Sequence, residues 1–194
     1  MDLGQSKSDP AAAVETNVPT QRDQCGWLEA RKRPIIGVAK GILLIDEHDY
    51  HVKVRATDLK TGLLEAPVDD LPELAVSSPP EFGGPEHVWS PEHLFVAAIA
   101  SCLMTTFQSI AANSGVEVLE YTDHSVGHLQ RGARGLYSMD RVTLRPTVLI
   151  SAESNVDRAI RLLDKAEKVC LIGRSVRSEM VLEPSVLQAH QVGT

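Results

Sequence analysis

The stretch that decides the fold is residues 90–115, which read SPEHLFVAAIASCLMTTFQSIAANSG. It opens with a strong helix start: Ser90 can cap free backbone N–H groups, and Pro91 suits the first helical position. Glu92 then complements the positive end of the helix dipole. Because Gly115 supplies a stop signal, we predict one helix that ends just before it. At about 1.5 Å per residue, this helix is more than about 30 Å long.

The predicted helix is apolar nearly all round, so it needs cover on most sides. Residues 94–112 are long enough to cross a bilayer. However, polar residues such as Ser101, Thr105 and Gln108 interrupt them, and no Lys, Arg or aromatic anchors flank them. We therefore interpret the segment as a buried central helix, covered by its own sheet or by a second copy of the chain, and we predict no membrane partner.

Upstream of the helix, short apolar or alternating segments are typical of strands at residues 35–39, 41–45 and 51–56. Turn signals at residues 46–49 and 60–62 join them into an antiparallel meander. The chain from 65 to 89 is rich in Pro and Gly, and we expect a long irregular loop there.

Downstream, residues 116–130 and 136–150 alternate in polarity and predict a β-hairpin around residues 131–135. Residues 155–169 carry apolar side chains at helical spacing, and residues 179–183 predict a last strand. The order of strands, helix, strands, helix and strand indicates an α+β fold.

Composition and length limit the architecture and the function. The 194 residues suit one domain, which we place at 27–194, after a Ser-, Pro- and Ala-rich flexible tail at 1–26. The net charge of −7 and the absence of any long basic run argue against nucleic acid as a partner. No basic and apolar signal sequence opens the chain, and the three cysteines form no C-x-x-C pair, so we predict a cytoplasmic protein with reduced thiols.

Two cysteines are candidates for chemistry: Cys102 within the long helix and Cys170 at the end of the second helix. Free cysteine often serves as a small buried hydrophobe, which is one interpretation of both. A functional thiolate instead needs a nearby cation, because apolar burial disfavours the charged form. Arg174 and Arg177 follow Cys170, whereas the helix around Cys102 supplies no such cation.

These segments carry a resemblance to a known family. SPEHLF at 90–95 with ASC at 100–102 is similar to the signature of the OsmC/Ohr family of peroxide-reducing proteins. EFGGP at 81–85 and AEKVC at 166–170 resemble the family too, and the similarity extends over residues 52–184. It implies an OsmC-like α+β fold, with antiparallel sheets packed around the long apolar helix, in an intertwined homodimer.

The resemblance also implies a thiol peroxidase that acts on organic hydroperoxides. Cys102 would be the peroxidatic thiolate, and its sulfenic acid would condense with Cys170 to a disulfide. An external dithiol would then reduce that disulfide, and the cycle needs no metal or organic cofactor.

In this family an Arg activates the thiolate and a Glu holds the Arg. Glu92 matches the Glu by position, although ten helical residues separate it from Cys102 by about 15 Å. One Arg would bridge the two only if the helix bends or if Glu92 acts across the dimer interface; alternatively, Glu92 is only a partner of the helix dipole. The family's basic position falls near Lys60, and Arg55 on the preceding strand is the other candidate.

Rival interpretations remain open. A non-catalytic OsmC-like homodimer would keep both cysteines and bind a small apolar ligand at the subunit interface, without a cation beside Cys102. Cys–His catalysis with His93 or His87 lacks an orienting partner in the sequence, and the cysteines lack paired zinc-ligand spacing. Cys25 fits neither scheme, and we interpret it as an incidental exposed thiol.

Overall fold

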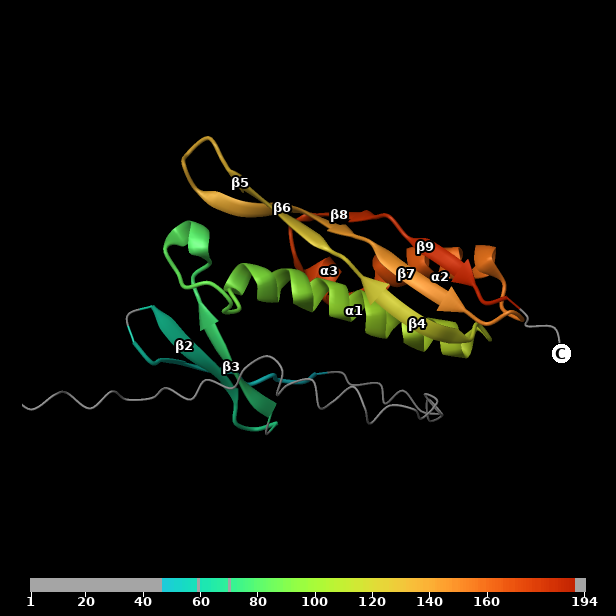
Figure 1. Ribbon diagram of the computed structural model, residues 1–194, viewed down its shortest axis with the longest axis horizontal. Coiled ribbons are helices and arrows are strands. Elements are labelled where there is room, and N and C mark those ends of the chain that lie inside the picture. Colours follow the sequence, from blue (N-terminus) through green and yellow to red (C-terminus); the bar gives the residue numbers. More distant parts are fainter. Residues whose placement is uncertain (1–46, 59, 70, 191–194) are drawn as a thin grey trace, which may run out of the picture. The chain divides into compact units, whose positions relative to one another are not determined.

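A computed structural model describes residues 47–58, 60–69 and 71–190. The strands expected at 35–39 and 41–45 lie outside these residues, as does the tail expected at 1–26. Figure 1 shows the order of the helices and strands along the described chain.

The long helix α1 (Pro91–Asn113) confirms the prediction, and Figure 1 shows it as one unbroken helix. Ser90 caps it, since its hydroxyl accepts the backbone N–H of His93 at 3.3 Å. Gly115, with a φ of 67°, turns the chain away after the last turn. By length and composition α1 would also suit a membrane, but one stripe of it forms the protein core: Ile99, Leu103, Phe107 and Ala111.

The predicted hairpin is present, but each of its two arms is divided into two strands that belong to different sheets. Strands β5 (Val126–Arg131) and β6 (Tyr137–Leu144) pair antiparallel in one sheet, and β4 (Val118–Asp123) pairs antiparallel with β7 (Pro146–Ile150) in the other. Asp123 marks the break between the sheets, because its carboxylate accepts the backbone N–H of Arg145 at 3.0 Å.

The C-terminal strands make both sheets mixed. Strand β8 (Glu179–Leu182), which matches the predicted last strand, pairs parallel with β6. Strand β9 (Ser185–Gln188), which the sequence did not predict, pairs parallel with β7. The predicted second helix is α2 (Val156–Val169), capped by Asn155, and a short helix α3 (Leu171–Ser175) follows it.

A separate antiparallel sheet precedes α1. It contains β1 (Lys53–Ala56), β2 (Thr61–Ala66) and β3 (Leu71–Ser77), followed by the single turn η2 (Pro80–Phe82). The prediction of an irregular loop over 65–89 was therefore wrong at the end of β2 and where β3 lies. The turn predicted at 60–62 was wrong at its last two residues, which begin β2. Pro72 suggested a loop, but proline is tolerated in an edge strand such as β3.

The hydrophobic core lies between the two helices and the C-terminal strands. The buried stripe of α1 packs with Ala159, Leu163 and Ala166 of α2 and with alternate residues of β6 and β7. Among the described residues, the β1–β3 sheet contributes no buried apolar side chain to this core. The core therefore positions α1, α2 and α3, and among the described residues it does not include the first sheet.

Candidate functional site

The fold brings Cys102 and Cys170 together. Cys102 lies in the middle of α1, and Cys170 lies between α2 and α3. The backbone N–H of Ile172 donates to the Cys102 sulfur at 3.5 Å, and that of Gly173 donates to the Cys170 sulfur at 3.4 Å. Both cysteines are free thiols, with Cys170 buried and Cys102 half-buried. Backbone N–H groups of the segment after α2 thus donate hydrogen bonds to both sulfurs.

The two thiols differ in acidity. Burial raises the pKa of Cys102, but hydrogen bonds to its sulfur outweigh burial and leave this pKa below its ordinary value. The donors of these hydrogen bonds are the Ile172 N–H, the Cys170 thiol, the Thr106 hydroxyl and the Leu171 N–H. Burial, together with the interaction with Cys102, raises the pKa of Cys170 to about 11. Cys102 is therefore the more acidic thiol of the pair, and Cys170 is the less acidic one.

The basic candidates lie in the first sheet and in its turn, and of the two Arg55 is held in an ion pair. The Arg55 guanidinium pairs with the carboxylate of Glu65 at 3.1 Å, and Lys53 pairs with the same carboxylate at 2.7 Å. Lys60 is exposed in the turn before β2, where its backbone N–H donates to Asp58 at 2.7 Å. Within the part of the chain that the structure describes, no Lys or Arg donates a hydrogen bond to Cys102.

Glu92 is half-buried in the first turn of α1. Its Oε2 atom is buried and has no hydrogen-bond partner among the described residues. Because α1 is unbroken, about 15 Å of helix separates Glu92 from Cys102. Among the described residues, no hydrogen bond joins Glu92 to Cys102.

His93, the candidate base for Cys–His catalysis, is bound to the helix cap. Its Nδ1 atom lies 2.8 Å from the hydroxyl of Ser90, and its ring packs edge-on against Trp89. The other candidate, His87, is exposed in the loop before α1, with a φ of 63°. Neither imidazole is hydrogen-bonded to Cys102 in the described chain, so the structure gives no support to a Cys–His dyad.

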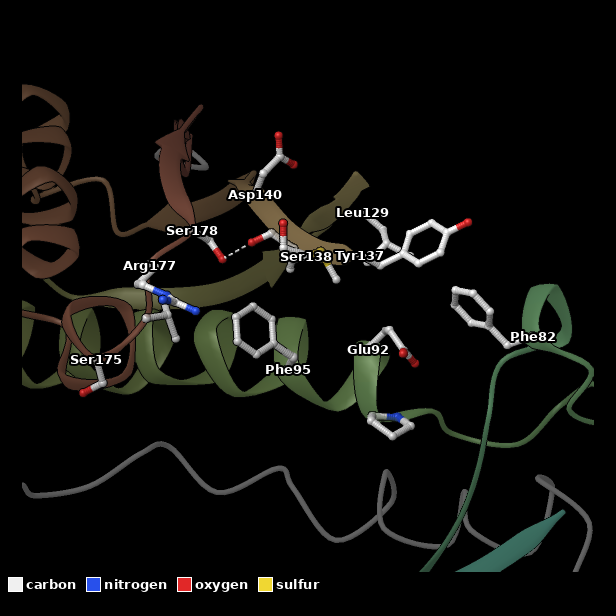
Figure 2. Close-up of a pocket in the computed structure, with 13 residues that line it drawn as sticks. Phe82, Glu92, Phe95, Leu129, Tyr137, Ser138, Asp140, Ser175, Arg177 and Ser178 are labelled. Atoms are coloured by element: carbon white, nitrogen blue, oxygen red, sulfur yellow. Dashed lines mark hydrogen bonds between the residues drawn. The ribbon is translucent and has the colours of Figure 1, made fainter. Parts of the chain in front are cut away.

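A cavity of about 820 Å³ lies beside the first turns of α1 and includes Glu92 but neither cysteine. Its walls come from η2, α1, the β5–β6 hairpin and the segment from α3 to β8 (Figure 2). The lining residues are Phe82, Pro91, Glu92, Phe95, Leu129, Tyr137, Ser138, Met139, Asp140, Ser175, Val176, Arg177 and Ser178. No sequence motif predicts this cavity, because its walls come from four separate segments.

Comparison with known proteins supports the resemblance. Residues 84–185 match the family model described as OsmC-like protein. The uncharacterized protein YmaD of Bacillus subtilis (strain 168) is 28% identical over 117 residues, which are 58% of this chain and 77% of that protein.

Solved structures agree with the family model. An OsmC-like protein of unknown function from Vibrio cholerae is 30% identical, with a TM-score of 0.63 over 72% of this chain and 99% of its own. An organic hydroperoxide resistance protein from Elizabethkingia anophelis shares the fold at 20% identity, with a TM-score of 0.58 over 74% of this chain and 99% of its own. The chain belongs to the OsmC-like protein family and has the family's α+β fold.

Proposed function

We propose that the protein is a thiol-dependent peroxidase that reduces organic hydroperoxides through Cys102 and Cys170. The observation that carries this proposal is the pairing of Cys102, a thiol of lowered pKa in α1, with Cys170, a thiol of raised pKa that follows α2. A thiolate is the nucleophilic form of cysteine. Solved proteins of the same fold include one named as an organic hydroperoxide resistance protein, which agrees with this chemistry.

The proposed cycle needs one hydroperoxide and one external dithiol per turnover. The Cys102 thiolate attacks the terminal peroxide oxygen, the O–O bond breaks, and the alkoxide leaves as the alcohol after taking a proton. Cys170, as the thiolate once its proton is lost, then attacks the sulfur of the resulting sulfenic acid, forming the disulfide and releasing water. Two electrons from an external dithiol restore both thiols by exchange.

The same proposal includes an intertwined homodimer that acts in the cytoplasm. Outside its buried stripe, α1 exposes a face of small residues that includes Ala98, Ser101 and Thr105. A helix face of small side chains lets another helix pack closely against it. We propose that a second copy covers this face and that a cation from the first sheet, Arg55 or Lys60, reaches Cys102 across the interface. Glu92 of the subunit that supplies the cation would hold this cation next to Cys102 of the other subunit.

The test is mass spectrometry of the reduced protein after brief exposure to tert-butyl hydroperoxide. We expect a Cys102–Cys170 disulfide within seconds, whereas Cys102→Ser forms none. Cys170→Ser should leave a sulfenic acid on Cys102 that dimedone traps. Cys25 provides an internal reference for the reactivity of an ordinary thiol. If Cys102 reacts no faster than Cys25, the peroxidase proposal is wrong.

The second candidate is a non-catalytic homodimer that binds a small apolar ligand. The cavity beside α1 favours it, because its volume suits a small molecule and neither cysteine lines it. Unreactive cysteines in the hydroperoxide experiment would support this function, whereas a rapid disulfide would support the peroxidase.

A further inference from the structure

Helix α3 begins at the cysteine pair and donates hydrogen bonds to both sulfurs. The backbone N–H of Ile172 donates to Cys102 at 3.5 Å, and that of Gly173 donates to Cys170 at 3.4 Å. The Cys170 side chain is thus the N-cap of α3. Because the first N–H groups of a helix have no partner within the helix, the two sulfurs satisfy donors that the helix itself leaves unpaired.

Helix α3 depends on contacts with its surroundings. It has five residues, and a helix of this length is not stable by its own hydrogen bonds. The Arg174 N–H donates to the Cys170 carbonyl at 3.0 Å, and the Ser175 hydroxyl donates to the Leu171 carbonyl at 2.8 Å. Ile172 packs against the core, whereas Leu171 is 67% exposed. The two sulfur acceptors therefore matter for the stability of α3.

The segment that contains α3 is anchored at both ends. Before it, Cys170 is 3% exposed at the end of α2. After it, the Ser178 hydroxyl donates to the Met139 carbonyl at 2.6 Å, and β8 pairs with β6. A change in the position of α3 is therefore confined to residues 171–177.

A disulfide between Cys102 and Cys170 removes both sulfur acceptors from α3. As the bond forms, the sulfurs move to about 2.05 Å from each other and leave the positions in which α3 donates to them. The Cys102 sulfur also loses the ability to ionise, and a charged acceptor forms stronger hydrogen bonds than a neutral one. The oxidised pair thus holds α3 less strongly than the reduced pair.

Reduction of this disulfide requires access to a sulfur. In thiol–disulfide exchange, the attacking thiolate must reach one of the two bonded sulfurs. Cys170 is buried, and the Gly173 backbone lies against its sulfur. Movement of α3 away from the pair therefore exposes the sulfur of Cys170.

We propose that α3 is a redox-sensitive gate, which is folded against the reduced pair and opens when the Cys102–Cys170 disulfide forms. The open gate admits the external dithiol. Oxidation takes two electrons and two protons from the thiols and forms one S–S bond; the dithiol returns them and becomes a disulfide itself. This proposal rests on the proposed function for the roles of the cysteine pair and the dithiol.

The test is hydrogen–deuterium exchange of the full chain carrying Cys25→Ser, in which Cys102 and Cys170 are the two remaining thiols. Diamide closes the disulfide without a hydroperoxide, since it accepts the two electrons and two protons, and peptide mapping confirms the bond. We expect the amides of residues 171–177 to exchange about tenfold faster after oxidation, because two hydrogen bonds are lost. Strand β7 is the internal control and should not change.

Unchanged or slower exchange of residues 171–177 in the disulfide form would overturn the proposal. A pair of thiols that diamide cannot join would overturn it as well.

Two variants separate the cap from the oxidation. Cys170→Ser and Cys170→Ala both prevent the disulfide, but serine supplies a hydroxyl that caps a helix and alanine does not. Without oxidant, residues 171–177 should exchange as in the reduced parent chain in Cys170→Ser and about fivefold faster in Cys170→Ala. Circular dichroism shows whether both variants keep the fold. Equal exchange in the two folded variants would show that the cap does not hold α3, which contradicts the gate.

The kinetics of reduction test the access of a dithiol. The rate at which dithiothreitol reduces the diamide-made disulfide should rise in proportion to the dithiothreitol concentration. A rate that levels off would mean that the disulfide is shielded, against the proposal. Because these experiments use no hydroperoxide, their failure leaves the peroxidase proposal standing, and a failure with tert-butyl hydroperoxide alone leaves the gate standing.

Discussion

The sulfur of Cys102 accepts a hydrogen bond from the backbone N–H of Ile172 at 3.5 Å. This contact ties the middle of α1 to the first residues of α3, which lie far apart in the chain. A hydrogen bond to sulfur stabilises the thiolate more than the thiol. The acidity of Cys102 therefore depends on the position of the chain after α2.

The first prediction concerns the order in which the thiols ionise. The pKa of Cys102 is below the ordinary thiol value of 9.0 and that of Cys170 is about 11, so Cys102 loses its proton first as the pH rises. Between pH 9 and about pH 11, iodoacetamide should modify Cys102 in preference to Cys170. Peptide mass spectrometry across a pH series measures the labelling of each thiol. Faster labelling of Cys170 than of Cys102 in this pH window would contradict the assignment.

The second prediction concerns Thr106, whose hydroxyl lowers the pKa of Cys102 from one helical turn away. Thr106→Val removes the donor, so the pKa of Cys102 should rise and its alkylation at neutral pH should slow by up to about tenfold. Thr106→Ser should restore the rate. Thr105→Val is the control, because the Thr105 hydroxyl bonds to the carbonyl oxygens of Ser101 and Cys102 instead. Equal effects of the two valine variants would show a general disturbance of the helix.

The third prediction compares two leucines of opposite exposure. Leu103 is 0% exposed in the core stripe of α1, whereas Leu136 is 72% exposed in the hairpin loop. Leu103→Ala should lower the free energy of unfolding by about 2–5 kcal/mol, because it leaves a cavity. Leu136→Ala should change it by less than about 0.5 kcal/mol. Urea unfolding of both variants checks the difference, and a similar loss in both would contradict this core.

The fourth prediction tests the proposed homodimer. Ala98 is exposed on α1, so Ala98→Arg places a long charged side chain in the proposed interface. We expect the variant to elute as a folded monomer, with light scattering to give the mass and circular dichroism to confirm the helix. Ala133→Arg, in the exposed hairpin loop, is the control and should stay dimeric. A wild-type chain that is itself monomeric would refute the interface.

Local signals predicted most of the elements. Ser90 and Gly115 set the ends of α1 through capping and turn chemistry, which act within a few residues. Strand β9 was missed because its pairing with β7 is non-local, and a strand as short as Ser185–Gln188 has little pattern of its own. Strand β3 was missed because Pro72 masked an alternating pattern.

The candidate site was predictable only in part. The resemblance identified Cys102 and Cys170, and their meeting follows from the packing of α1 against the segment after α2. Thr106 was detectable in principle, since it lies four residues after Cys102 and thus on the same helix face. Arg177 was not predictable as a cavity residue, because only tertiary structure places it beside Phe95.

The parallel pairing of β8 with β6 and of β9 with β7 has a consequence for biosynthesis. Both strands come from the last part of the described chain, after α2, so neither sheet is complete until residues 179–188 have left the ribosome exit tunnel. Until then, β6 and β7 each lack a neighbour, and their unpaired backbone groups offer an edge to which other nascent chains can add. Translation that stalls before residue 179 therefore yields an aggregation-prone product, which is a natural client for chaperones.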